Sequence, residues 1–266
     1  MALTIGGGPL AARPPETVNY QIDGPRHRLF WHDFPRRVRA LFGGQVVLDS
    51  RNAKLLHESN LLPQLYVPAG DVRDDLLEPS SHTTHCPFKG DARYHSVRVG
   101  DRVAENAVWS YPEPTSDSSW LAGHMAVYWK SMDAWFDEDD EVFGHIRDPY
   151  HRVDIRKTSQ LVRVVAGDVV VAESRRAKLL SETGLPNRYY VPQADVRTDL
   201  IEPSATHTVC PYKGQASYRA LRLGDVVIAD AAWLYPEPLD GARPIADHLC
   251  FVAEGLQTWA DDRQVA

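Results

Sequence analysis

Two short stretches of the sequence combine a cysteine with a lysine at a spacing that favours chemistry. The first reads Thr84-x-Cys86-Pro87-x-Lys89-Gly90, and it returns as Thr208-x-Cys210-Pro211-x-Lys213-Gly214. Proline fixes φ after the cysteine and glycine permits a tight turn, so the lysine is held in a short loop. Such a lysine offers a point charge to a carboxylate or phosphate, and it would also activate a neighbouring thiol as a nucleophile. The alternative is an inert, buried cysteine beside a surface lysine.

The histidines are weaker candidates for catalysis. His27 recurs as His151 and His124 as His248, so a general acid or base would come from these, with His248 as our choice; a structural histidine is the alternative. The run Ser81-His82-Thr83-Thr84-His85-Cys86 resembles a metal cluster, but the second stretch has Thr206 and Val209 where the first has histidines. No paired C-x-x-C is present either. We therefore expect no metal and no cofactor.

An aromatic pair follows each lysine loop. Residues 92–99 and 102–110 predict two strands joined by Gly100-Asp101, a typical two-residue turn. With those residues central, Trp109 lies opposite Ala92, and Tyr94 and Trp109 become diagonal neighbours on one face. Arg98 lies on the same side, and the second stretch repeats the arrangement with Tyr218, Trp233 and Arg222. The face predicts a partly apolar binding surface; the alternative is that these aromatics only pack the core.

The elements that position these residues belong to a duplicated domain. Residues along the whole unit recur 124 positions later, as His27 and His151 do, and the unit is much longer than the ~20–50 residues of a solenoid repeat. The predicted organisation is a flexible leader at 1–23, a first domain at 24–141, a linker at 142–147 and a second domain at 148–266. Because the linker is short, we expect the two domains to pack on each other.

Most local patterns within each unit predict β structure. Residues 38–41 and 45–48 form a predicted hairpin, as do 162–165 and 169–171 around Gly167-Asp168. Residues 50–58 and 174–182 predict a short helix that ends at Asn60 or Gly184. The stretch 62–87, with several prolines, predicts irregular, extended backbone. The fold class is therefore mainly β, or a β-rich α+β fold.

Composition limits the classes of function. The net charge is −7, which argues against a nucleic-acid binder with a basic face. Three cysteines are too few for a disulfide framework and indicate a reducing compartment. The sequence has neither a secretory signal nor an apolar run of the ~20 residues needed to cross a bilayer. We expect a cytoplasmic protein without a membrane partner.

The motifs together resemble family 427 of the domains of unknown function, which is also filed under a nucleotidyltransferase-like name. They are, in the second copy, Ser-Arg-x-Ala-Lys-Leu-Leu, Glu-Thr-Gly-Leu-Pro, Tyr-Tyr-Val-Pro, Asp-Val-Arg-x-Asp-Leu, Glu-Pro-Ser, Thr-x-Cys-Pro-x-Lys-Gly and Ala-x-Trp-x-Tyr-Pro-Glu-Pro. The resemblance implies two tandem domains of the β-tent type, each with two sheets that meet at an angle. Relatives of that fold hold zinc through paired cysteines, which this chain lacks. It also lacks a glycine-rich phosphate loop followed by paired aspartates, so the nucleotidyltransferase name finds no support in the residues.

These observations favour a small-molecule-binding protein, and three functions are compatible with them. The first is an enzyme that acts on a small anionic or nucleotide- or sugar-like metabolite, the second a non-catalytic sensor, and the third an interaction scaffold that could form homo-oligomers. If one copy alone is active, we expect it to be the second, which follows the family motifs more closely. The candidate catalytic residues are Lys213, Cys210, His248, Lys89 and Cys86. The candidate ligand-binding residues are Tyr190, Asp195, Arg197, Thr208, Tyr218, Arg222, Trp233, Tyr235, Tyr66, Asp71, Arg73, Tyr94, Trp109 and Tyr111.

Overall fold

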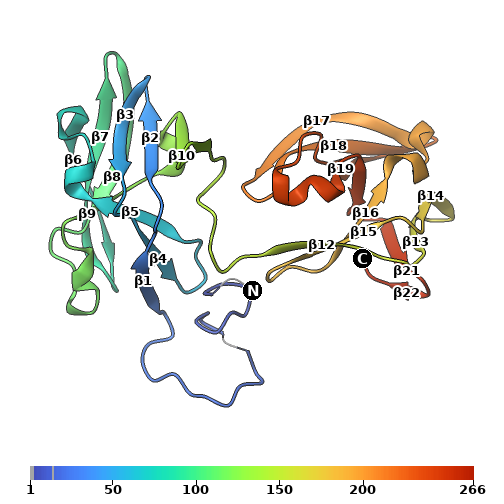
Figure 1. Ribbon diagram of the computed structural model, residues 1–266, viewed down its shortest axis with the longest axis horizontal. Helices are drawn as coiled ribbons and strands as arrows, with labels where there is room; N and C mark the ends of the chain where they lie inside the picture. Colours follow the sequence, from blue (N-terminus) through green and yellow to red (C-terminus); the bar gives the residue numbers. More distant parts are fainter. Residues whose placement is uncertain (1–2, 14) are drawn as a thin grey trace. The chain divides into compact units, whose positions relative to one another are not determined.

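The computed structural model describes residues 3–13 and 15–266, which fold into two compact units (Figure 1). The first unit extends to Asp148 and the second comprises Pro149–Ala266. Each unit contains a seven-stranded and a four-stranded antiparallel sheet with the same strand order. The structure thus confirms the predicted mainly β fold, and it confirms the duplication at the level of topology.

In the first unit, the seven-stranded sheet has the order β1-β4-β5-β9-β8-β7-β6. Its strands are β1 (Leu29–Asp33), β4 (Lys54–Glu58), β5 (Gln64–Pro68), β9 (His124–Val127), β8 (Arg102–Ser110), β7 (Gly90–Val99) and β6 (Leu77–Cys86). The four-stranded sheet has the order β11-β10-β2-β3. Its strands are β11 (Asp140–Glu141), β10 (Ala134–Asp137), β2 (Val38–Phe42) and β3 (Gln45–Ser50).

The second unit repeats this plan. Its seven-stranded sheet consists of β12 (Val153–Lys157), β15 (Lys178–Glu182), β16 (Arg188–Pro192), β20 (His248–Phe251), β19 (Val226–Leu234), β18 (Gly214–Leu223) and β17 (Ile201–Cys210). Its four-stranded sheet consists of β14 (Val169–Ser174), β13 (Val162–Ala166), β21 (Leu256–Ala260) and β22 (Arg263–Gln264). Short 3₁₀ turns connect the strands, and the longest are η3 (Ser116–Leu121) and η7 (Asp240–Ile245).

Each large sheet carries a cluster of buried residues on both faces. In the first unit, one face packs on the small sheet through aliphatic residues such as Val108. The opposite face carries an aromatic cluster that includes its neighbour Trp109 and is covered by Leu121 of η3. Successive side chains of a strand point to opposite faces, so β8 contributes to both clusters. The aromatic face is therefore built by the same strands that form the core.

The predicted helices at 50–58 and 174–182 are wrong, because each segment ends in a strand of the large sheet. Leu55, Leu56, His57 and Glu58 of β4 are all buried, since both sides of the strand are covered. A strand buried on both faces shows no polar alternation, and a short apolar run of this kind is easily mistaken for a helix. Asn60 and Gly184 do have positive φ, of 68° and 79°, but they lie in turns between strands. The stretch 62–87 is also more regular than predicted, since it contains β5 and the ten-residue β6.

The predicted hairpins are confirmed, but the register of the aromatic one differs beyond its turn. Val99 pairs with Arg102 across the Gly100-Asp101 turn as expected, and then a bulge near Asn106, whose φ is 52°, shifts the pairing. Tyr94 consequently lies directly opposite Trp109 rather than diagonal to it. The shift amounts to two residues, so Tyr94 and Trp109 keep their predicted common face, whereas Ala107 next to the bulge packs in the opposite cluster. The placement of both rings on one side of the ribbon is therefore confirmed.

Part of the leader, residues 4–11, contacts the first domain, whereas most of residues 15–23 are exposed. The backbone of Asn60 donates to the carbonyl of Thr4 at 2.8 Å, and the Ser59 hydroxyl donates to the carbonyl of Leu10 at 2.7 Å. Thr4 and Ala11 are buried. These contacts fix the leader on the turn between β4 and β5.

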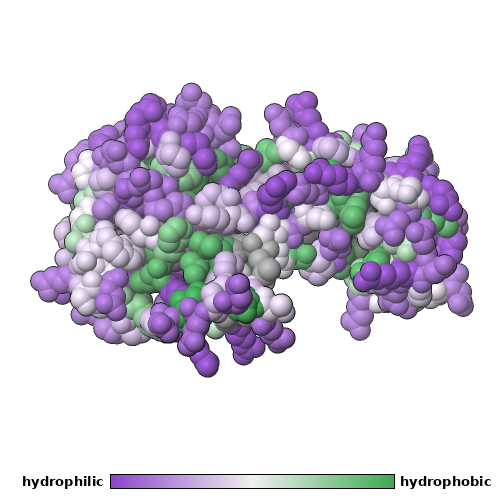
Figure 2. Space-filling model, turned by 60° about the horizontal axis from the view of Figure 1, so that its bottom comes forward, coloured by the Kyte–Doolittle hydropathy of each residue, from purple (hydrophilic) through white to green (hydrophobic). Residues whose placement is uncertain are grey.

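The surface is largely polar. Figure 2 shows hydrophilic residues over most of one face, with hydrophobic residues gathered in smaller patches between them. Within the described residues, no helix is long and apolar enough to cross a membrane.

Candidate functional site

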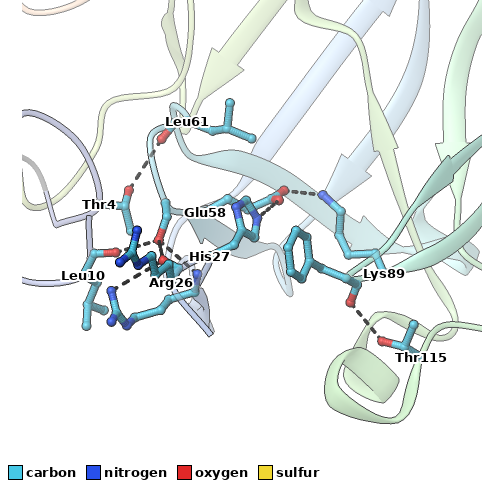
Figure 3. Close-up of polar contacts among 11 residues, drawn as sticks. Thr4, Leu10, Arg26, His27, Glu58, Leu61, Lys89 and Thr115 are labelled. Atoms are coloured by element: carbon cyan, nitrogen blue, oxygen red, sulfur yellow. Dashed lines mark hydrogen bonds and ion pairs between the residues drawn. The ribbon is translucent and has the colours of Figure 1, made fainter. Parts of the chain in front are cut away.

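A largely buried carboxylate lies on the aromatic side of each large sheet. In the first domain this is Glu58, the last residue of β4. Lys89, from the turn between β6 and β7, donates its ammonium to Glu58 Oε1, and His27 Nε2 lies 3.2 Å from Oε2 (Figure 3). Glu58 is 5% exposed and Lys89 8%. Because the carboxylate accepts, His27 donates through Nε2, and both carboxylate oxygens are engaged.

The second domain repeats this cluster with the same residue types. Lys213 Nζ donates to Glu182 Oε2 at 2.5 Å, and His151 Nε2 lies 3.0 Å from Oε1. Burial alone would raise the pKa of Glu182, but hydrogen bonds from His151 and Lys213 outweigh it and leave the pKa below its ordinary value. The carboxylate is therefore ionised at neutral pH. We call the three residues of each domain the His–Glu–Lys cluster: His27, Glu58 and Lys89 in the first, and His151, Glu182 and Lys213 in the second.

Four aromatic side chains lie beside each cluster, and hydrogen bonds fix the orientation of three of them. In the second domain, Trp233 Nε1 donates to the Tyr190 hydroxyl at 3.1 Å, and the Tyr218 hydroxyl lies 3.2 Å from Thr208 Oγ1. The corresponding distances in the first domain are 3.2 Å and 2.9 Å. Burial raises the pKa of Tyr190 and of Tyr235 above the ordinary value, so both phenols stay neutral. They can offer hydroxyl groups but no negative charge to a ligand.

A cavity of about 240 Å³ opens beside the cluster of the second domain. Its lining residues are Leu180, Glu182, Leu185, Pro186, Arg188, Tyr190, Lys213, Tyr218, Trp233 and Tyr235. Tyr218 and Trp233 are only half-buried, with ring centroids 6.0 Å apart. Aromatic rings on one side and charged groups on the other are the usual composition of a small-molecule site.

The same aromatic residues of the first domain are covered by their neighbours. Tyr94 and Trp109 are 6% and 8% exposed. The ring of Tyr128 lies 4.5 Å from that of Trp109, and Trp31 lies 5.5 Å from Tyr66 and 4.8 Å from Trp120. The residues at the three covering positions of the second domain are smaller or aliphatic: Ile155, Pro244 and Val252. The difference explains why Tyr218 and Trp233 are accessible.

Arg188 adds a positive charge that the cluster does not neutralise. It lines the cavity from the first position of β16, and no carboxylate of the described residues forms an ion pair with it. Lys213 and Glu182 compensate each other, so Arg188 leaves the cavity with a net positive charge. The equivalent residue of the first domain is the neutral Gln64. The cavity can therefore attract an anionic group.

The structure brings together five of the predicted site residues at this cavity. Tyr190, Lys213, Tyr218, Trp233 and Tyr235 line it, and Thr208 holds Tyr218 in place. The corresponding aromatic cluster of the first domain consists of Tyr66, Tyr94, Trp109 and Tyr111. The hydroxyl of Thr84 is hydrogen-bonded to that of Tyr94, and Lys89 Nζ lies 5.6 Å from the centre of the Tyr111 ring. The aromatic part of the predicted site thus converges on one place in each domain.

The arginines and aspartates that the sequence predicts to bind a ligand do not line the cavity. Arg197 pairs with Asp199 and Arg222 with Glu202, and neither arginine lines the cavity. Asp195 accepts from Ser174 and Arg176. The first domain repeats these contacts: Asp71 accepts from Ser50, Arg73 pairs with Asp75, and Arg98 pairs with Glu78. The Asp-Val-Arg residues therefore pair with neighbours and not with each other.

The candidate catalytic cysteine and histidine are held by backbone contacts. Cys210 ends β17, and its carbonyl accepts from the Lys213 amide at 3.3 Å, as Cys86 does from Lys89 at 3.1 Å. The ammonium of Lys213 is directed to Glu182, and no base contacts the thiol among the described residues. His248 Nδ1 donates to the Ala246 carbonyl at 2.5 Å and does not line the cavity.

Sequence reasoning missed Glu58, Glu182 and Arg188. Glu182 was visible only as part of a repeated motif, although a glutamate retained in both copies beside buried leucines is a signal of a satisfied internal charge. Its partners lie 31 residues away on either side in the sequence, so no local pattern connects them. Arg188 differs between the copies, with Gln64 at the equivalent position, so a comparison of retained residues does not identify it.

Comparison with known proteins identifies a family for both domains. A family model described as "Domain of unknown function (DUF427)", with a short name that refers to nucleotidyl transfer, matches residues 31–138 and again 154–262. No curated protein matches the chain. Among residues 3–13 and 15–266, no group of three or more histidine, cysteine or acidic side chains is arranged to hold a metal ion.

Proposed function

Since the chain belongs to the DUF427 family, in two tandem copies, and that family's description names no activity, we propose a function from the site itself: the second domain binds a small, planar, negatively charged metabolite. The first domain carries the same cluster in a covered form and serves as a structural partner.

The observation that supports this proposal is the cavity with aromatic walls and Arg188 at its side. Half-buried Tyr218 and Trp233 offer ring surfaces for a planar group, and stacking on aromatic side chains is favourable in such geometry. Arg188 supplies a planar guanidinium for a carboxylate or phosphate. The volume of about 240 Å³ lies below the ~300–1,000 Å³ of sites for drug-sized ligands, so a single ring with one acidic group fits the cavity better than a whole nucleotide.

The geometry supports binding more than turnover. The sequence favours an enzyme through Lys213 and Cys210, but Lys213 is ion-paired to the largely buried carboxylate of Glu182 and would have to leave it to act as a nucleophile. The thiol has no adjacent base in the described residues. We therefore propose recognition of the metabolite as the function, and detection of a product would redirect the assignment to catalysis.

Calorimetric titration of the full chain tests the proposal with benzoate and nicotinate as anionic probes and with benzamide and nicotinamide as their neutral counterparts. We expect the anions to bind, the amides to bind at least about 10-fold more weakly, and Arg188→Gln to abolish the difference. Gln64→Ala in the first domain is the matched control and should leave the titration unchanged. Equal affinity for acids and amides, or normal affinity of a Trp233→Ala variant that remains folded, would contradict the proposed site.

We also propose that the protein acts in a reducing compartment such as the cytoplasm. Its three cysteines are free among the described residues, and Cys250 is fully buried. Burial raises the pKa of the Cys250 thiol to about 12, so this group is unreactive.

A further inference from the structure

A separate cavity lies in the first domain, beside His27 of its His–Glu–Lys cluster. Its volume is about 440 Å³, within the range of small-molecule sites. The leader forms one wall, with Leu10, Ile22 and Asp23, and the domain, beginning with Pro25, forms the rest. From the domain come His27, Arg28, Leu29, Phe30, Pro87, Phe88, Thr115, Ser116 and Asp117. The cavity is thus specific to the copy that carries a leader.

Arg28 in this cavity has lost the acidic partner of its counterpart. In the second domain, Arg152 pairs with Asp154 at 2.9 Å. The position of Asp154 is occupied in the first domain by Phe30, and Arg28 forms no ion pair with any described residue. The exchange replaces a negative charge by an apolar wall and leaves the guanidinium uncompensated.

The guanidinium of Arg28 also retains an unused hydrogen-bond donor. Its Nη1 donates to the carbonyl of Ala11 at 3.0 Å and, at 3.5 Å, to that of Arg26, which are uncharged acceptors. Its Nε is buried and has no partner. A buried donor without an acceptor is rare in proteins and is often explained by a missing ligand or water.

The remaining walls are mostly apolar. Phe88 stacks on His27, with ring centroids 4.2 Å apart and planes 15° from parallel. Leu29, Phe30 and Ile22 add aliphatic and aromatic surface. Asp23 and Asp117 are exposed, so solvent and salt screen their charges more than that of a group buried in the cavity.

We propose that this cavity binds an amphiphilic carboxylate, with the carboxylate on Arg28 and an apolar tail between the leader and the Phe30–Phe88 wall. The carboxylate would supply the negative charge that Asp154 supplies in the second domain, and its oxygens would accept from the guanidinium. The proposal is independent of the ligand of the second domain, because the two cavities share no residue.

Titration of the full chain with octanoate, 1-octanol and octylamine tests the proposal. We expect octanoate to bind at least about 10-fold more tightly than octanol, octylamine not to bind, and Arg28→Gln to reduce octanoate binding to the level of octanol. Arg152→Gln, the matched variant of the second domain, should have no effect, and neither should Arg188→Gln.

A second variant keeps the test informative if Arg28→Gln fails to fold. Ile22→Asp changes a half-buried leader residue and should weaken octanoate by a similar factor, because it removes apolar wall and adds negative charge. Equal binding of octanoate and octanol to the wild type, a preference for octylamine, or loss of octanoate binding on Arg188→Gln would each overturn the proposal.

Discussion

The two domains keep the same charged centre and differ in what surrounds it. Histidine, glutamate and lysine occupy equivalent positions with nearly the same contacts in both. The neighbours Trp31 and Tyr128 of the first domain cover the aromatic face, whereas Ile155 and Val252 of the second leave it open. The comparison teaches that the cluster belongs to the framework of the fold, and that access to it is decided by a few apolar positions around it.

The largest loss of stability is expected when the His–Glu–Lys cluster is disrupted in the first domain, where the cluster is more deeply buried. Lys89→Ala leaves the buried Glu58 carboxylate with His27 alone, and removal of one partner of a buried ion pair typically costs about 3–5 kcal/mol of unfolding free energy. Chemical denaturation followed by tryptophan fluorescence measures the loss. Lys213→Ala should cost less, because the cavity admits water to Glu182. An equal or larger loss on Lys213→Ala would show that the two clusters do not differ in this way.

A narrower change should convert the open domain into the closed one. Val252→Tyr introduces the residue that stands at the equivalent position of the first domain, where the Tyr128 ring packs on Trp109. The new ring should cover Trp233 and weaken benzoate binding by at least about 10-fold, or about 1.4 kcal/mol. Calorimetric titration measures the change, and the far-ultraviolet circular dichroism spectrum checks the fold. Val252→Ile, which keeps the aliphatic character, is the control. Unchanged binding by the tyrosine variant would separate the cavity from the binding site.

The charge of Glu182 predicts a pH dependence of the second domain. Its pKa is lowered in the folded protein, so its contribution to stability is present above the unfolded value, near 4.5, and is lost as the pH falls through the folded pKa. The second-domain transition of the wild type should therefore weaken below about pH 4.5, and Glu182→Gln should remove part of that slope. Thermal unfolding between pH 3 and 7 measures it. An identical slope in wild type and variant would contradict the assigned protonation.

The smallest effect is expected at an arginine that the sequence places at the site and the structure places outside it. Arg197 is exposed and pairs with Asp199, and exposed ion pairs contribute about 0–1 kcal/mol. Arg197→Ala should therefore leave stability and benzoate affinity nearly unchanged, as its twin Arg73→Ala should. A clear loss of affinity measured by the same titration would return Arg197 to the binding site and weaken the choice of Arg188.

Repetition and local turn chemistry made much of the fold predictable. The duplication, both types of hairpin and the shared face of Tyr94 and Trp109 follow from sequence patterns. The register of that hairpin does not, because a bulge at Asn106 inserts residues that no turn rule announces.

The candidate site was predictable in its aromatic part and in Lys213, but not in Glu182 or Arg188. Tyr218 and Trp233 are neighbours within one hairpin, whereas Glu182 meets His151 from the segment before β12 and Lys213 from the turn between β17 and β18. Such a cluster depends on the order of the strands in the sheet, which local sequence patterns do not reveal. Arg197 and Arg222 illustrate the opposite error, since each is already paired, Arg197 with Asp199 two residues away and Arg222 with Glu202 on the neighbouring strand β17.

The docked leader has a consequence for how this protein is made. Its hydrogen-bond partners Ser59 and Leu61 follow Leu10 and Thr4 by 49 and 57 residues, so the leader leaves the ribosome long before its acceptor turn exists. Protection of its peptide bonds from added protease must therefore arise only after strands β4 and β5 are paired. The time at which this segment becomes resistant to protease therefore reports when the first domain has folded. It can be measured while the second domain is still being translated.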